Sequence, residues 1–403
     1  MDRHPTRRGD PLVVACLLGG AAGWAMTAAG AGAGVLAAAY DTSLVAVGLM
    51  TTALAVTYAS LQLPAGSFVD RVGVRSASLL GLTVVVVAHA AALTVPLTWV
   101  ALLCRAVAGA GYAVCFVSGA ELARRSGTGP SGVGLFGGVS LAASGAAVLV
   151  VPFAEPLLGW RAAWWTSGTV AVVALLMVVR SPAPARLVPD PGDSPSTGDG
   201  GPSLLRDGEL HRLAAVHAVT LGLGVVLSNW AALVLEDSWG FDRTTAALTG
   251  SVVLGMSVLS RPLGGHLVRR VPDRMGHIVA LSLAGCSAAT LSLAFPTAPL
   301  VAVLAVVALG VLSGLPFAGV ITAAQARRPD RPAAAVGLLN SQANMVIVVG
   351  TPLMGATLEH GAASAALWGM AGLWLVPLLA RPRSGRLSGR RRATPRRQRR
   401  RLR

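Results

Sequence analysis

Charged residues are scarce in this chain, and their scarcity excludes most kinds of water-soluble protein. Only 12% of the 403 residues are Asp, Glu, Lys or Arg, whereas 54% are apolar, and the mean hydropathy is +0.65. Residues 13–39, 77–95 and 279–294 contain no charged residue at all. A helix crosses a bilayer with about 20 apolar residues, so the composition predicts a chain that lies in a membrane.

The apolar runs also lack the alternation of an outer-membrane β-strand, which excludes a barrel pattern. A backbone in hydrocarbon must then satisfy its hydrogen bonds within each segment, as a helix does. The sequence predicts an all-α polytopic membrane protein with twelve transmembrane helices in two pseudo-symmetric six-helix bundles. We expect these helices at about 13–39, 45–67, 76–95, 97–119, 132–153, 160–180, 211–235, 245–268, 276–296, 299–325, 333–357 and 363–380.

Lysine is absent, so all 33 basic residues are arginines, and their distribution is uneven. With both termini on the cytoplasmic side, only Arg161 and Arg243 fall in outward loops, while Arg105 and Arg261 lie inside predicted helices. Arginine and lysine accumulate in cytoplasmic loops. We therefore expect a multi-pass protein of a bacterial-type inner (plasma) membrane with both termini in the cytoplasm.

Signals for catalysis, metals and cofactors are missing. The chain has no phosphate-binding Gly-x-x-x-x-Gly-Lys-Ser/Thr, and its four cysteines have no metal or disulfide spacing. No nucleophile stands with a base, and histidines such as His89 and His217 have no ligand partners at metal spacing. We expect no enzyme activity, no metal and no cofactor.

Two polar segments divide the chain. Residues 181–203 are rich in Pro, Gly, Asp and Ser, a composition typical of a flexible linker, and the stretch after Arg381 is rich in arginine without an acid. We predict bundles at 1–180 and 211–381, a cytoplasmic linker at 181–210 and a tail at 382–403. The tail is expected to meet anionic lipids and not nucleic acid.

The two halves repeat each other. Residues 66–75 (GSFVDRVGVR) align without gaps on residues 265–274 (GHLVRRVPDR), an offset of 199 residues. After a slip of a few residues, VGLF at 133–136 also matches VGLL at 336–339. The common order of these matches is typical of parallel repeats in a transporter.

The first copy of the repeat, Gly66-x-x-x-Asp70-Arg71-x-Gly73-x-Arg75, lies in a tight loop where the aspartate can meet a helix end or an arginine. It resembles the signature loop of the major facilitator superfamily. The resemblance implies alternating access, a cytoplasmic latch and usually a monomer. The gating residues that it implies are Gly66, Asp70, Arg71, Gly73, Arg75, Glu121, Arg269 and Arg270.

Other segments also resemble this superfamily: Arg105-Ala-Val-Ala-Gly109-Ala-Gly111, Gly159-Trp160-Arg161 and Arg261-Pro-Leu-Gly-Gly265. The last is most similar to the nitrate/nitrite and cyanate porters, in which an arginine here binds the anion. The offset of 199 residues places Gln62 where those porters have a second arginine, a departure that does not favour nitrate itself. The glycine pattern of drug antiporters in the fifth helix is poorly matched.

We predict a secondary active transporter of a small solute, either a small anion or a carboxylate. The alternatives are an efflux transporter of a neutral or hydrophobic metabolite or drug, and a membrane sensor that does not transport. Every acid falls in a loop, a tail or a helix end, so the coupling ion stays open. Arg105 could be structural, and the asparagines could join helices instead of lining a cavity. The candidate substrate-binding residues are Arg261, Gln62, Tyr58, Arg105, Asn229, Asn340 and Asn344.

Overall fold

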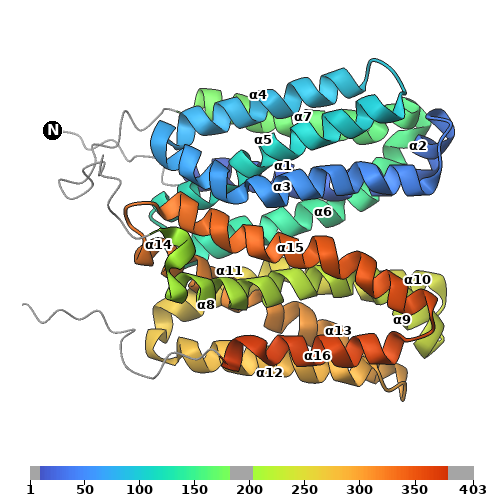
Figure 1. Ribbon diagram of the computed structural model, residues 1–403, viewed down its shortest axis with the longest axis vertical. Coiled ribbons are helices and arrows are strands. Elements are labelled where there is room, and N and C mark those ends of the chain that lie inside the picture. Colours follow the sequence, from blue (N-terminus) through green and yellow to red (C-terminus); the bar gives the residue numbers. More distant parts are fainter. Residues whose placement is uncertain (1–9, 182–202, 380–403) are drawn as a thin grey trace, which may run out of the picture.

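The computed structural model describes residues 10–181 and 203–379, and the described chain is built from helices with short connections. The helices form two bundles side by side, one from α1 to α7 and the other from α8 to α16 (Figure 1). Residues of the predicted linker from 182 to 202, and the predicted tail at 382–403, lie outside the described residues.

The first bundle begins with α1 (Asp10–Ala31), and the short α2 (Ala33–Ala39) follows it as a separate helix, where the sequence predicted one span. Ser43 caps the next helix by accepting a hydrogen bond from the N–H of Ala46, and Gly73 ends that helix with a φ of 85°. The remaining elements are α3 (Leu44–Val72), α4 (Val74–Ala92), α5 (Thr98–Arg125), α6 (Pro130–Leu158), η1 (Gly159–Arg161) and α7 (Ala162–Arg180).

The second bundle starts earlier than the sequence predicted, because Asp207 caps α8 and the helix therefore begins at Gly208. Three of its long apolar stretches are each divided into consecutive helical segments. Its elements are η2 (Leu204–Arg206), α8 (Gly208–His217), η3 (Ala218–Leu223), α9 (Gly224–Trp239), α10 (Arg243–Gly255), α11 (Ser257–Arg270), η4 (Pro272–Arg274), α12 (Met275–Leu293), α13 (Pro299–Gly314), α14 (Pro316–Arg327), α15 (Pro332–Glu359) and α16 (Ala363–Leu379).

Ten stretches of the described chain are long and apolar enough to cross a membrane. The longest, Pro130–Arg180, has 51 residues and contains both α6 and α7, with η1 between them. The apolar helix α16 is shorter, at 17 residues. The protein is thus an all-helical, multi-pass membrane protein.

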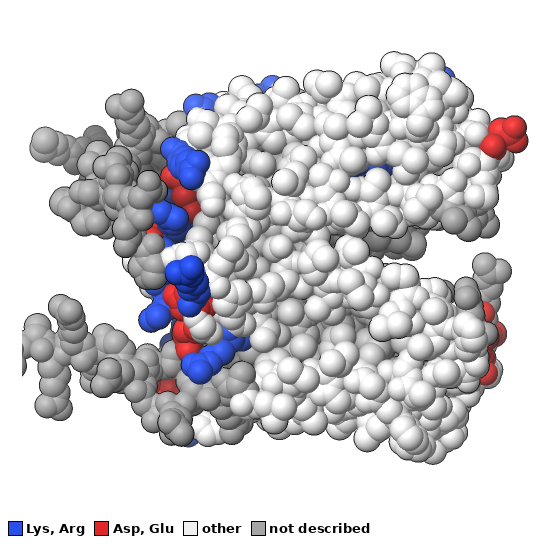
Figure 2. Space-filling view, in the orientation of Figure 1, with Lys and Arg blue, Asp and Glu red and all other residues white. Residues whose placement is uncertain are grey.

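The outer surface of the bundles is apolar. Large side chains such as Phe153, Leu157 and Leu379 are exposed over 82%, 88% and 89% of their area. Figure 2 shows an uncharged belt between a crowded charged end and a sparsely charged opposite end. Exposed apolar surface of this extent is stable in lipid and not in water.

The charged end, hereafter the arginine-rich end, holds the ends of helices from both bundles. Its exposed arginines include Arg71, Arg75, Arg124, Arg125, Arg269, Arg270 and Arg327. The two bundles meet along two helix pairs, α3 with α15 and α6 with α11. At the opposite end a cleft separates the bundles (Figure 2).

Candidate functional site

The contacts between the two bundles depend on glycines near the arginine-rich end. A Cβ at Gly66 would lie 2.5 Å from the carbonyl oxygen of Ala333, and one at Gly265 would lie 2.3 Å from that of Pro130. Because no side chain separates the backbones, α3 and α15 approach closely at one place and α6 and α11 at the other. The closed end is therefore the arginine-rich end.

Deeper in the bundle, a second pair of glycines repeats this arrangement. A Cβ at Gly337 would lie 2.2 Å from the carbonyl oxygen of Gln62, and one at Gly134 would lie 2.3 Å from that of Arg261. Gln62 and Arg261 are 199 residues apart, the same offset that relates the sequence repeats. The two crossings are thus built on equivalent positions of the two halves.

Asp70 joins the two halves at the α3–α15 crossing. Its carboxylate oxygens accept hydrogen bonds from the N–H groups of Ala333 at 3.1 Å and Ala334 at 2.9 Å. These donors belong to the first turn of α15, where helix N–H groups lack partners and the helix dipole favours a negative charge. The sequence left two contacts open for Asp70, a helix end or an arginine. In the structure its carboxylate hydrogen-bonds to a helix end.

The other crossing has no such cap. Arg269 stands in the repeat where the first half has Asp70, and its Cδ would lie 3.8 Å from a Cβ at Gly129, just before α6. Pro130, the first residue of α6, has no N–H to donate, and Gly129 makes no side-chain cap. Within the described chain, a carboxylate therefore caps the helix at the α3–α15 crossing and not at the α6–α11 crossing.

The remaining candidate gating residues have different surroundings. Gly73 allows the positive φ of the turn, Arg75 donates to the carbonyl of Val179 at 3.1 Å, and Arg71 and Arg270 are exposed. The carboxylate of Glu121 is buried and pairs with the two arginines that follow it on α5, Arg124 and Arg125. Its hydrogen-bonded contacts thus stay within one helix.

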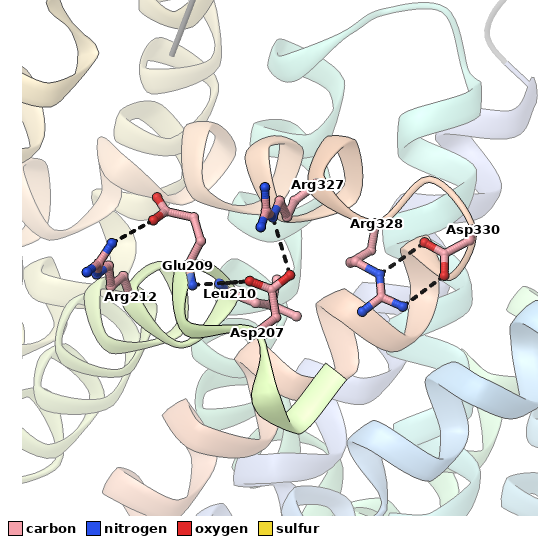
Figure 3. A network of polar contacts seen from close by, with 7 residues as sticks. All are labelled: Asp207, Glu209, Leu210, Arg212, Arg327, Arg328 and Asp330. Atoms are coloured by element: carbon pink, nitrogen blue, oxygen red, sulfur yellow. Dashed lines mark hydrogen bonds and ion pairs between the residues drawn. The ribbon is translucent and has the colours of Figure 1, made fainter. Parts of the chain in front are cut away.

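A polar network at the same end ties the start of α8 to the residues before α15 (Figure 3). Asp207 accepts from the N–H groups of Glu209 and Leu210 and pairs with Arg327 at 3.3 Å. Partial burial would raise the pKa of the Asp207 carboxyl, but these partners together hold it below its usual range.

The residue after Arg327, Arg328, forms a bidentate ion pair with Asp330, with N–O distances of 2.8 and 3.0 Å (Figure 3). Arg328 is buried, and the pKa of the Asp330 carboxyl is lowered by its hydrogen bond to Arg328. Two residues later α15 begins, where Asp70 caps it. The residues that precede the latch are therefore held in place by ion pairs.

Arg261 lies in the interior of the protein with 4% of its surface exposed. Its Nη1 donates to the carbonyl of Gly137 on α6 at 2.9 Å, and its Cζ lies 4.0 Å from the centre of the Phe317 ring. Its Nε has no hydrogen-bond partner, and no acid pairs with it among the described residues. A charge buried without a counter-charge is costly, and a bound anion would offset the cost.

Arg261 lines a small cavity of the second bundle, which Leu141 of α6 closes from the first bundle. The cavity volume is about 10 Å³, roughly the space of one water molecule. Three hydroxyl residues share its lining, namely Thr220, Ser257 and Ser313, and the hydroxyl of Ser257 is buried without a partner. The site thus offers one cation and hydroxyl donors around a space that fits a small group.

Three helix interruptions of the second bundle meet at this cavity. The π-helical η3 contributes Thr220, the break between α10 and α11 precedes Ser257, and the break between α13 and α14 follows Ser313 and Gly314. The sequence predicted continuous helices at all three places. Irregular backbone at membrane depth is tolerated where it lines a cavity, and single π-helical turns are frequent at functional sites.

Gln62, the counterpart of Arg261, is fully buried, and its amide faces the hydroxyl of Tyr58 on the same helix. Its amide oxygen and nitrogen have no hydrogen-bond partner on another element among the described residues. Tyr58, one turn earlier, is also buried, and its ring stands edge-on to Phe116 with the centres 6.2 Å apart. Among the described residues, no hydrogen bond or ring contact joins either side chain to Arg261. Gln62 is thus a buried polar group at the inter-bundle crossing with no partner on the facing helix.

The asparagines differ in what they contact. Oδ1 of Asn340 lies 2.9 Å from Nε2 of His217, and its Nδ2 is buried without a partner. Asn344 donates to the backbone carbonyl of Asn340, within its own helix. Asn229 is farther along its bundle, where it donates to Thr351 at 3.5 Å. Of the three asparagines, only Asn340 contacts His217, whose ring packs against Phe317.

The profile of the Major Facilitator Superfamily matches residues 13–351, most of the described chain. The chain belongs to the Major Facilitator Superfamily. No curated protein sequence matches it significantly. The superfamily points to a membrane transporter of small molecules and not to an enzyme.

Solved structures share the fold of this superfamily member. The human organic anion transporter MFSD10 (TETRAN) has a TM-score of 0.69 and 18% identity over 94% of this chain and 99% of that one. FucP in the outward conformation has a TM-score of 0.69 and 13% identity over 92% and 97% of the two chains. The E. coli fucose:proton symporter FucP, in a variant form, gives 14% identity at the same TM-score and the same coverage.

Arg105 is held differently from the other intramembrane arginine of this transporter. It is 1% exposed, and it donates to the carbonyls of Ala25 at 2.9 Å and Met50 at 3.2 Å. Both acceptors belong to the first bundle, on α1 and α3. The geometry gives Arg105 a role in joining these helices.

Sequence reasoning missed part of the central site. His217 counted as a lone histidine, and Phe317, Thr220 and Ser257 were not singled out. Phe317 follows Gly314-Leu-Pro, a helix-breaking signal inside an apolar run that could have drawn attention to it. His217 and Asn340 are 123 residues apart, and nothing in the sequence alone places them in contact.

Proposed function

We propose that the chain is a secondary transporter that carries a small anion or carboxylate by alternating access. The observation that carries this proposal is Arg261, a buried cation at the junction of the two bundles with which no acid of the described chain pairs. Its partners are a carbonyl and an aromatic face, which stabilise the cation without neutralising it. A solute with a negative charge would supply the missing counter-charge.

The cavity holds about one water molecule in this state, and the donors around it favour a compact solute. An anion beside Arg261 would also meet the hydroxyl of Ser257, which is buried without a partner, while the buried amide of Gln62 stands at the equivalent position of the other crossing. Hydroxyl and amide N–H groups donate to negatively charged oxygens. Tyr58 and Asn340 border the same crossing, whereas Arg105, Asn229 and Asn344 have partners elsewhere.

In this proposal the transporter has twelve spans, formed when α6 and α7 are counted separately and α16 is included. The arginine-rich end is cytoplasmic by the positive-inside rule, and the bundles 1–180 and 211–381 rock about the two crossings as a monomer. The structure is then closed towards the cytoplasm. Asp70, Gly66 and Gly265 act as gating residues of the closed end, and the ion pairs of Figure 3 support them.

The test is binding by the purified protein in detergent. Thermal unfolding would be followed with nitrate, nitrite, cyanate, small carboxylates and neutral solutes for the wild type, Arg261→Gln and Arg180→Gln. Arg180 is exposed at the end of α7, so its variant has the same change in charge without a change in the site. A solute that binds the folded state raises the unfolding temperature.

The proposal expects one or more anions to stabilise the wild type and Arg180→Gln but not Arg261→Gln. Stabilisation by neutral or hydrophobic solutes alone, equal in the three proteins, would replace the anion with a neutral metabolite or drug. Uptake into proteoliposomes then separates a transporter from a sensor that only binds.

A further inference from the structure

His217 and Arg261 face the same aromatic ring. The ring of His217 lies 5.7 Å from that of Phe317, centre to centre, and the guanidinium carbon of Arg261 lies 4.0 Å from the centre of Phe317. His217 is fully buried at the end of α8, immediately before the π-helical η3 that lines the cavity. One titratable group and one fixed cation therefore share the central site.

The hydrogen bonds of His217 leave a place for one proton. Its Nε2 lies 2.9 Å from the amide oxygen of Asn340, which can only accept, so Nε2 carries the hydrogen. In the neutral ring Nδ1 is then a bare acceptor, and Nδ1 is buried without a partner. A proton that binds His217 binds at Nδ1.

The surroundings of His217 contain no negative charge that would hold this proton. The elements packed against it present Phe317 from α14 and Asn340 from α15, and α16 carries no charged residue. The charged group that acts on the ring is Arg261. The charged residues of α8 and α14, Glu209, Arg212 and Arg327, lie at the arginine-rich end. Within the described chain, every acid lies near a helix end or in a connection.

We infer that His217 carries the coupling proton and that an anion and a proton bind together. Protonation of Nδ1 would place a second positive charge beside Arg261, and repulsion opposes it in a buried site. An anion at Arg261 neutralises the first charge and removes the repulsion. By linkage, the anion promotes protonation of His217 and the proton promotes binding of the anion, so the two move in the same direction.

This inference rests on the proposed anion site and adds the coupling that the sequence left open. The proton moves from water to Nδ1 when the site is open on one side and returns to water from Nδ1 when it opens on the other. An O–H bond of hydronium breaks as this N–H bond forms, and the reverse exchange releases the proton on the other side. A histidine suits the role because imidazole is the side chain that changes charge near neutral pH.

The experiment measures anion affinity as a function of pH by titration calorimetry, with nitrate and formate as probes between about pH 5.5 and about pH 8, the range of imidazole titration. Both probes stay ionised there, so any dependence on pH belongs to the protein. The proteins are the wild type, His217→Gln and His89→Gln, which removes a buried histidine bonded to Tyr112 in the other bundle. Uptake of protons by the wild type on addition of each probe is recorded in weakly buffered solution.

We expect the affinity of the wild type and of His89→Gln to rise as the pH falls, by at most about tenfold per pH unit for one linked proton. His217→Gln should bind with an affinity that does not depend on pH, and only proteins with His217 should take up protons. Proton uptake by the wild type supports the inference even if His217→Gln does not fold.

Three results overturn the inference, each in a distinguishable way. If the anions bind the wild type with an affinity independent of pH and without proton uptake, the anion site stands and His217 has no coupling role. If the affinity for the anion falls as the pH falls, the proton and the anion compete for the protein. The transporter would then exchange one for the other and would not carry both in the same direction. If no anion binds at any pH, the anion site fails and the inference fails with it.

Discussion

Replacing Asp70 with asparagine should loosen the closed arginine-rich end. The carboxylate accepts two hydrogen bonds from the first turn of α15, at 3.1 and 2.9 Å. A hydrogen bond to a charged group contributes about 1.5–3 kcal/mol, and a charge at a helix N-terminus adds about 0.3–1 kcal/mol. Asparagine keeps one neutral acceptor, so we expect the closed state to lose about 1–2 kcal/mol, a change of about 5- to 30-fold in the ratio of closed to open molecules.

The assay is a distance measurement by pulsed electron paramagnetic resonance. Spin labels attached through an unnatural amino acid at positions 76 and 277 would report the separation of α4 and α12 at this end, and the four native cysteines would stay in place. Ser76 and His277 are both exposed. The population with the longer distance should grow in Asp70→Asn and grow further in Asp70→Ala, which leaves both N–H groups without a partner.

Asp273→Asn is the matched control, because it removes an exposed carboxylate from the corresponding connection of the second half. It should leave the distances unchanged. Unchanged distances in both Asp70 variants would refute the latch. An equal shift in Asp273→Asn would show that net charge at this end, and not the cap on α15, controls closure.

Three further outcomes follow from the same contacts. Gly66→Ala and Gly265→Ala should open the arginine-rich end in the same assay, because each new Cβ would overlap a carbonyl, whereas Gly276→Ala, with open space around it, should not. Arg105→Gln should lower the free energy of unfolding by about 1–3 kcal/mol, since buried carbonyls lose their donors, while the thermal response to anions persists. Asp207→Asn should be less stable than the wild type above about pH 4. Because the folded-state pKa of Asp207 is depressed, this difference in stability should fade as the pH falls through that pKa. A difference in thermal unfolding that stays constant from about pH 3 to about pH 7 would contradict this expectation.

The sequence was sufficient to predict the helical membrane fold, because hydropathy and charge scarcity act over about 20 residues at a time. The offset of 199 residues also predicted which positions correspond, and the paired glycine crossings at Gln62 and Arg261 follow it. The ends and interruptions of helices were predicted less well. The separation of α1 from α2 and the break at Met256 both fall inside apolar runs, where hydropathy gives no sign of them.

The site around Arg261 was also predicted only in part, because its contacts join residues that are far apart in the sequence. Arg261 was visible in the sequence because an arginine inside an apolar run is rare. Its contact with Phe317 and the contact of His217 with Asn340 join separate helices, and the π-helical turn of η3 has no signature in its residues Ala218–Leu223. The roles of Gln62, Asp70 and the other candidates stay predictions until binding and distance measurements test them.

The interruptions of α8–η3–α9, α10–α11 and α13–α14 all lie in the second of two halves that repeat each other. In the first half, α3 and α5 continue past the same depth, and α1 gives way to α2 only beyond it, at Gly32. Repeated halves need not diverge evenly: a straight helix restricts substitution to residues that keep its packing, whereas a broken one accepts changes in length and polarity at the break. Diversification of what such a protein carries would therefore be concentrated in its second half, with the first half kept as the frame against which new specificities arise.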